Sequence, residues 1–242
     1  MNGKPASGYS GVPCEARVVA ADPAVIMAQL EIDLFSDIVC PWCFIGSHRL
    51  DQVLASEGDV VVNYRTFMLD PTVPPEGESI RDRLRRKYGV EPERAFATVT
   101  AAARESGLDL DPSKQPKIYR TESAHTLLRH AAAKGTQRAL ARALFEAHFV
   151  EVKNISDIDT LAGIATRHGF DADEAVRLLR DPEERTLTHE EARHASEGGI
   201  NGVPFFVFDG KLAVSGAQPA DVLRAAIARA REAQKANGAE GP

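Results

Sequence analysis

Two cysteines at the junction of an expected strand and an expected helix constrain this chain more than any other feature. Residues 30–36, LEIDLFS, alternate apolar and polar side chains, as a strand does. The segment Cys40-Pro41-Trp42-Cys43 follows, and Pro41 suits the first position of a helix, which needs no N–H. We therefore expect Cys40 at a helix N-terminus, where free N–H groups favour a thiolate. Cys43 would lie one turn further, on the same side.

This pair could hold a metal, form a disulfide, or be an accidental pair of core cysteines. A zinc site needs two more ligands, but Cys14 lies in an expected loose extension, and only His189 and His194 have a fitting spacing. The other histidines (His48, His125, His130, His148 and His168) are interpreted as surface or core residues, with His125 at a domain interface. We favour reversible dithiol–disulfide chemistry and expect no metal.

The cellular setting is predicted from the cysteine content and from the lack of targeting signals. Three cysteines are too few for a disulfide framework. The first 30 residues have no apolar core of secretory length, and no segment is apolar enough to span a membrane. We expect a cytoplasmic protein, where thiols stay reduced and a structural Cys40–Cys43 disulfide is disfavoured.

Charge gives no indication of a nucleic-acid partner. The net charge is −6, and the longest basic cluster, RDRLRRK at residues 81–87, is interpreted as a solvated helix face. We expect neither nucleic-acid nor membrane partners.

The remaining patterns predict a discontinuous α/β domain with a helical insertion. The first helix should run from Pro41 to about Glu57 and end at Gly58, before a second strand in VVVNYRTFML from Val60. PFFVFDGKLAVSG, from Pro204, predicts a hairpin that turns at Asp209 and Gly210, before a helix over about 220–235.

Between these flanks we expect short helices and no strand. Each should end at a glycine, and their apolar stripes, such as Ile80, Leu84 and Tyr88, should be core positions; the closing glycines are Gly89, Gly107, Gly135, Gly169 and Gly198. The predicted domains are a flexible extension (1–29), a discontinuous domain (30–77 and 187–236), an all-helical insertion (78–186) and a flexible tail (237–242).

Three motifs, in four stretches of the sequence, resemble the DsbA family of thioredoxin-fold dithiol–disulfide oxidoreductases, and more narrowly its FrnE-like branch. SDIVCPWCFIG is similar to the family's active-site strand and helix, and GINGVPFFVFDGKLAVSGAQP to its cis-proline loop and final hairpin. AHTLLRHAAAKG and LFEAHFVEVKNISDIDTLAGIA are similar to its inserted helical domain. The resemblance covers about residues 31–231. It implies a thioredoxin-like α/β fold with a large all-helical insertion.

The resemblance also implies site residues and partners. Cys40 and Cys43 would be the catalytic redox pair, and Pro41, Trp42, Val203 and Pro204 would bind substrate, with a cis bond between the last two. Substrates would be protein or small-molecule disulfides and dithiols. No cofactor is expected, although glutathione is a candidate redox partner.

Two residues depart from the family pattern. Trp42 stands where DsbA itself has a histidine that stabilises the thiolate, so we expect a weaker oxidant, between about −270 and −120 mV. Arg120 replaces an asparagine that is frequent in the family, with no evident consequence.

Two other functions stay open. One is a glutathione-dependent transferase or isomerase of the kappa or chromene-carboxylate type, which resembles this chain in the insertion and in GVPFF but has a serine at the active position. The other is a redox-inert binding module. The direction of the physiological reaction and the role of Cys14 are not predicted.

Overall fold

The computed structural model describes residues 29–239. The expected N-terminal extension, with Cys14, lies outside these residues except for residue 29. No helix in the described part has the length and apolar character needed to cross a bilayer.

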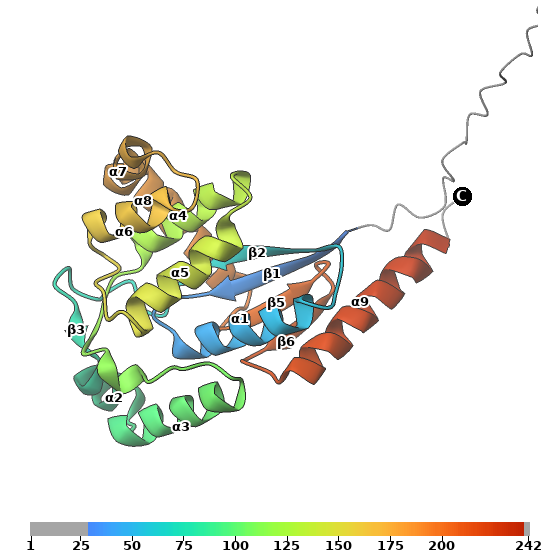
Figure 1. Cartoon of the computed structure of the whole chain (residues 1–242), viewed down its shortest axis with the longest axis horizontal. Coiled ribbons are helices and arrows are strands. Elements are labelled where there is room, and N and C mark those ends of the chain that lie inside the picture. Colours follow the sequence, from blue (N-terminus) through green and yellow to red (C-terminus); the bar gives the residue numbers. More distant parts are fainter. Residues whose placement is uncertain (1–28, 240–242) are drawn as a thin grey trace, which may run out of the picture.

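A four-stranded sheet forms the centre of the molecule (Figure 1). Its order is β2-β1-β5-β6, from β1 (Leu30–Ser36), β2 (Val60–Thr66), β5 (Phe205–Phe208) and β6 (Leu212–Ser215). β1 pairs with β2 in parallel and with β5 antiparallel, and the β5–β6 hairpin completes the sheet. The alternation in β1 places Leu30, Ile32 and Leu34 in the core.

Helices flank the sheet and connect its two halves. The helix α1 (Pro41–Leu54) packs against α9 (Ala220–Ala239), which also contacts β1, β5 and β6. Between β2 and β5 the chain forms seven helices and one 3₁₀ turn: α2 (Ile80–Tyr88), α3 (Pro92–Glu105), η1 (Pro112–Lys114), α4 (Glu122–Ala133), α5 (Gln137–Phe149), α6 (Ile158–Thr166), α7 (Ala172–Arg180) and α8 (Pro182–Glu197). In Figure 1, α4 to α8 lie together on one side of α1, while α2 and α3 lie on the other side. The fold is the expected thioredoxin-like α/β fold with a large helical insertion.

The insertion nevertheless contains a short antiparallel ladder that the sequence did not predict. β3 (Glu78–Ser79) pairs with β4 (Lys117–Ile118), and the Ile80 N–H donates to the Pro116 carbonyl. Two-residue strands are too short to show a sequence period, so the expectation of a segment without strands was wrong here. The proposed boundary at residue 186 falls inside α8, which is one continuous helix.

Several helix ends also differ from the expectation. α1 ends at Leu54 rather than near Gly58, and its C-cap Ala55 has a right-handed conformation. Gly198 has a φ of −71°, and the positive φ is at Gly199. α9 continues to Ala239, so residues 237–239 are helical rather than part of a tail. The other four expected closing glycines do have positive φ.

Candidate active site at Cys40 and Cys43

Cys40 caps the helix that follows the central strand. It is the N-cap residue of α1, with Pro41 in the first helical turn. The Cys43 and Phe44 N–H groups donate to the Cys40 carbonyl at 3.0 and 3.3 Å, so the first turn forms directly after the cysteine. Cys40 therefore lies at the N-terminal, positive end of the helix dipole.

The segment before β5 lies next to Cys40. The Cys40 thiol approaches the Val203 carbonyl at 3.7 Å, although the two residues are 163 positions apart. The Val203–Pro204 peptide bond is cis. A Cβ at Gly46 would lie 2.8 Å from Pro204 Cγ, so α1 packs directly on the proline ring. The structure thus brings all six expected site residues together: Cys40, Pro41, Trp42, Cys43, Val203 and Pro204.

The two cysteines differ in their surroundings. Both are free thiols; Cys40 is 4% exposed and lines a cavity, while Cys43 is fully buried. Burial raises the pKa of Cys43 well above its usual value, and the neighbouring Cys40 raises it further. The Asp37 backbone and the Ser36 side chain lower this pKa, which identifies them as neighbours of the Cys43 sulfur. Cys43 therefore keeps its proton at neutral pH in the reduced protein.

A buried polar cluster beside Cys43 was missed by the sequence reasoning. The Asp37 Oδ2 accepts a hydrogen bond from the Leu69 N–H at 2.7 Å, and its Oδ1 lies 3.4 Å from His125 Nε2. Ser36, Asp37 and His125 are each at most 2% exposed. A polar Ser-Asp pair at the end of a buried strand, directly before the cysteines, was the available signal. His125 lies on α4 and meets the end of β1, which agrees with the domain interface expected for it.

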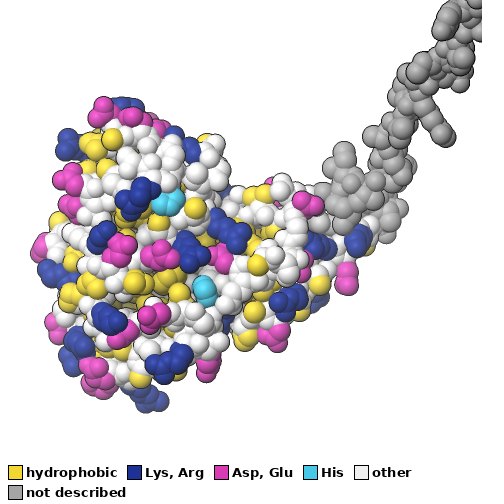
Figure 2. Space-filling model, viewed as in Figure 1, with side chains coloured by type: hydrophobic (Ala, Val, Ile, Leu, Met, Phe, Trp, Pro, Cys, Tyr) yellow, Lys and Arg dark blue, Asp and Glu magenta, His cyan; other side chains and the backbone are white. Residues whose placement is uncertain are grey.

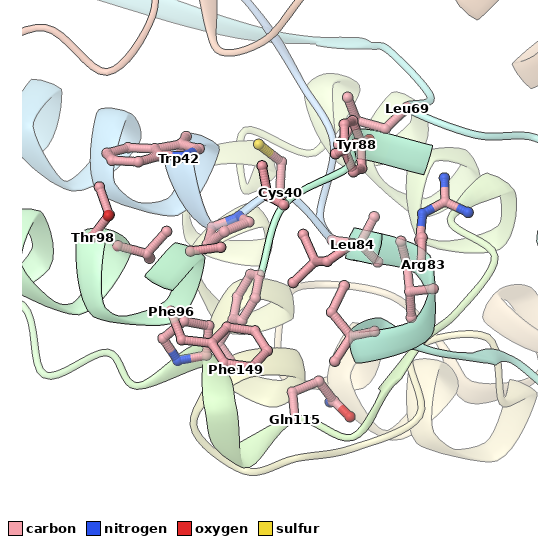
Figure 3. A pocket seen from close by; sticks show the side chains of 18 of the residues that line it. Cys40, Trp42, Leu69, Arg83, Leu84, Tyr88, Phe96, Thr98, Gln115 and Phe149 are labelled. Carbon is pink, nitrogen blue, oxygen red and sulfur yellow. The ribbon is translucent and has the colours of Figure 1, made fainter. Parts of the chain in front are cut away.

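A cavity of about 520 Å³ opens beside Cys40. Figure 3 shows the Cys40 sulfur between the side chains of Trp42 and Tyr88, with Phe96 and Phe149 further along the wall. This volume lies within the range of small-molecule sites, about 300–1,000 Å³. Among residues 29–239, no group of three or more His, Cys, Asp or Glu side chains could hold a metal ion.

Comparisons with known proteins agree with this geometry. A family model described as "DSBA-like thioredoxin domain" matches residues 31–228. The solved structure of a probable DsbA oxidoreductase from Streptomyces coelicolor is 33% identical, with a TM-score of 0.74, and the match covers 83% of this chain and 89% of that one.

Two further matches are more distant. The uncharacterized protein YwbO of Bacillus subtilis (strain 168) is 27% identical over 82% of this chain and 96% of its own length. The structure of a 2-hydroxychromene-2-carboxylate isomerase is 16% identical, with a TM-score of 0.66, over 87% of this chain and all of its own. At that identity the likeness shows the fold alone.

Proposed function

Because the chain belongs to the family of DSBA-like thioredoxin domains, we propose that it is a thiol–disulfide oxidoreductase whose redox centre is the Cys40–Cys43 pair. The observation that carries the proposal is the contrast between the two thiols. Cys40 lies at the N-terminus of α1 and lines a cavity, while Cys43 is fully buried one turn away.

The roles of the two cysteines follow from this contrast. Cys40 is the nucleophile: its thiolate attacks a substrate disulfide and forms a mixed disulfide, and one substrate sulfur leaves as a thiolate. Cys43 then loses its proton and attacks the Cys40 sulfur, which releases the second substrate thiol and leaves a Cys40–Cys43 disulfide. A dithiol or a thiol such as glutathione returns the pair to its reduced form. The reverse sequence oxidises a substrate dithiol.

The backbone at Val203 suits a protein disulfide as the substrate. Gly202 and Val203 line the cavity beside Cys40, and the Val203 N–H makes no hydrogen bond to another described residue. An extended peptide could pair with this backbone as an added strand, with Pro41 and Trp42 on its other side. The FrnE-like branch and the cytoplasmic location remain predictions from the sequence.

Insulin reduction with dithiothreitol tests the proposal. The parent should accelerate precipitation of the insulin B chain, and Cys40→Ser should not. Cys43→Ser should accumulate mixed disulfides that are visible on non-reducing gels, because the second attack is lost. Brief iodoacetamide treatment with mass spectrometry should label Cys40 well before Cys43. Faster labelling of Cys43, or full activity in Cys40→Ser, would refute the assigned roles.

The isomerase function is the second candidate, because the fold is shared with the 2-hydroxychromene-2-carboxylate isomerase and this chain has an apolar cavity of its own beside Cys40. The double variant Cys40→Ser Cys43→Ser separates the two functions. Glutathione-dependent isomerisation of an aromatic substrate by this variant would favour the isomerase, and loss of all turnover would favour disulfide exchange.

A further inference from the structure

One face of α2 is apolar and only partly covered by protein. Ile80, Leu84 and Tyr88 were expected to be core positions; Ile80 does pack against the core, but all three also line the cavity beside Cys40. Tyr88 is 48% exposed, and the neighbouring Val90, which also lines the cavity, is 41% exposed. Figure 3 shows Leu84 and Tyr88 on the wall that faces Trp42 and Phe96. The wall can therefore bury more apolar surface only by taking up another molecule.

The charges that line the cavity have one sign. Arg83, Arg94 and Lys117 line it, and no Asp or Glu of residues 29–239 does. His148 also lines it but is neutral at physiological pH, because burial lowers its pKa to about 4. This is unusual on a protein with a net charge of −6, and Figure 2 shows acidic and basic side chains mixed over the visible face.

Two of these three cations are not neutralised by protein carboxylates. Arg83 is held by Asp70 at 2.6 Å and Glu78 at 3.3 Å. Arg94 has no carboxylate partner within 4.0 Å among the described residues, and the Lys117 Nζ donates to the Glu76 carbonyl at 3.1 Å and to no carboxylate of these residues. Arg94 lies on α3, which packs against α1, and Lys117 lies on β4; both residues are exposed. An anionic group bound there would meet two free positive charges.

We propose that this cavity binds a small organic anion with an apolar body. The acidic group faces Arg94 and Lys117, and the body lies against the apolar wall of α2 and Phe149. This deepens and rests on the proposed exchange at Cys40: besides protein disulfides, Cys40 reduces the disulfide of a small, acidic, apolar thiol that binds in this cavity. The reduced pair gives two electrons to this disulfide, which leaves as two thiols after taking two protons, and an external dithiol reduces the pair again.

Two matched dyes test the binding without any redox step. 8-Anilinonaphthalene-1-sulfonate is anionic, while N-phenyl-1-naphthylamine has the same rings without the charge. Trp42 lines the cavity and is the only tryptophan of the chain, so energy transfer from it reports binding at this place. Titrations use the double variant Cys40→Ser Cys43→Ser.

We expect the anionic dye to bind more tightly than the neutral one. Arg94→Gln with Lys117→Gln should weaken binding of the anionic dye about three- to tenfold and leave binding of the neutral dye unchanged, since two exposed ion pairs are lost and each contributes little. Arg224→Gln with Arg229→Gln, on the exposed face of α9, removes the same charge and should change neither dye. If both dyes bind equally tightly, and the substitutions at Arg94 and Lys117 change neither affinity, the proposal is overturned. The cavity would then fit an apolar side chain of a polypeptide substrate instead. No binding of either dye would also overturn it.

Exchange rates connect the cavity to Cys40. In a Cys14→Ser background, reduced protein is mixed with 5,5′-dithiobis(2-nitrobenzoate), which is anionic, or with neutral 4,4′-dithiodipyridine. The Arg94 and Lys117 substitutions should lower the ratio of the two rates about three- to tenfold. If the anionic dye binds more tightly but the substitutions leave the ratio of the two exchange rates unchanged, the assignment of the substrate is refuted. Exchange retained in Cys40→Ser would instead refute the proposed function, whatever the dyes show.

Discussion

The buried thiol of Cys43 should make the reduced protein sensitive to alkaline pH. In an unfolded chain a cysteine loses its proton at about pH 8.5. In the folded protein, burial and then Cys40 raise the pKa of Cys43 well above that value. Above about pH 8.5 the native state therefore holds a proton that the unfolded state has lost. The free energy of unfolding must then fall as pH rises.

The size of this loss follows from proton linkage. One retained proton costs about 1.4 kcal/mol for each pH unit above the unfolded pKa. Between about pH 8.5 and 10 the contribution of Cys43 is thus a loss of about 2 kcal/mol. Below about pH 8.5 the Cys43 thiol is protonated in both the folded and the unfolded state, so it causes no loss of stability there. The loss stops growing only above the raised pKa of the folded thiol. Tyr64 acts in the same direction, because burial and then Asp51 raise its pKa, but its unfolded pKa is near 10, so it contributes little below that pH.

Urea unfolding in the presence of a non-thiol reductant measures this loss. The parent and Cys43→Ala are compared at about pH 7, 8.5 and 10, and Tyr64→Phe serves as the control for the tyrosine. Cys43→Ala is less stable at every pH because it leaves a cavity, but its stability should decline by about 2 kcal/mol less over the alkaline range. Parallel curves for the parent and Cys43→Ala would show that Cys43 ionises as freely in the folded protein as in the unfolded one.

Three other substitutions test separate parts of the site. Asp37→Ala should lower the free energy of unfolding by about 1–3 kcal/mol in urea titrations, because the Leu69 N–H loses its acceptor; an unchanged free energy of unfolding would contradict this. Gly46→Ala should cost about 1–3 kcal/mol and slow insulin reduction, since its Cβ would lie 2.8 Å from Pro204 Cγ, and parental activity would exclude a close packing of α1 on the proline. Trp42→His should make the pair more oxidising by about 30–60 mV in a glutathione titration, because histidine can donate a hydrogen bond to the thiolate; an unchanged potential would refute this role of the position.

The central sheet and the cysteine helix could be predicted because their signals are local. The alternation in residues 30–36 gave β1, and the proline after Cys40 gave the start of α1. Asp209 and Gly210 gave the turn of the hairpin, and both have positive φ. Each of these features depends on backbone preferences within a few residues.

Features set by distant contacts could not be predicted in the same way. The β3–β4 ladder joins segments 38 residues apart through two residue pairs, and neither segment has a period of its own. The stripe on α2 was recognised correctly as apolar, but periodicity does not tell whether an apolar face meets protein or a cavity. The close approach of Asp37 to His125 likewise depends on where α4 meets the end of β1.

The redox pair and the walls of the cavity come from different parts of the chain. Cys40 and Cys43 belong to the β1–α1 unit, and their chemistry depends on the helix terminus and on burial beneath it. The opposite walls of the cavity come from α2 and α3, which belong to the insertion and make few contacts with the sheet. Substitutions on α2 and α3 can therefore change which disulfide reaches Cys40 while leaving the redox pair intact. A substitution of Ser36, in contrast, changes the surroundings of Cys43 itself and therefore affects exchange with every substrate.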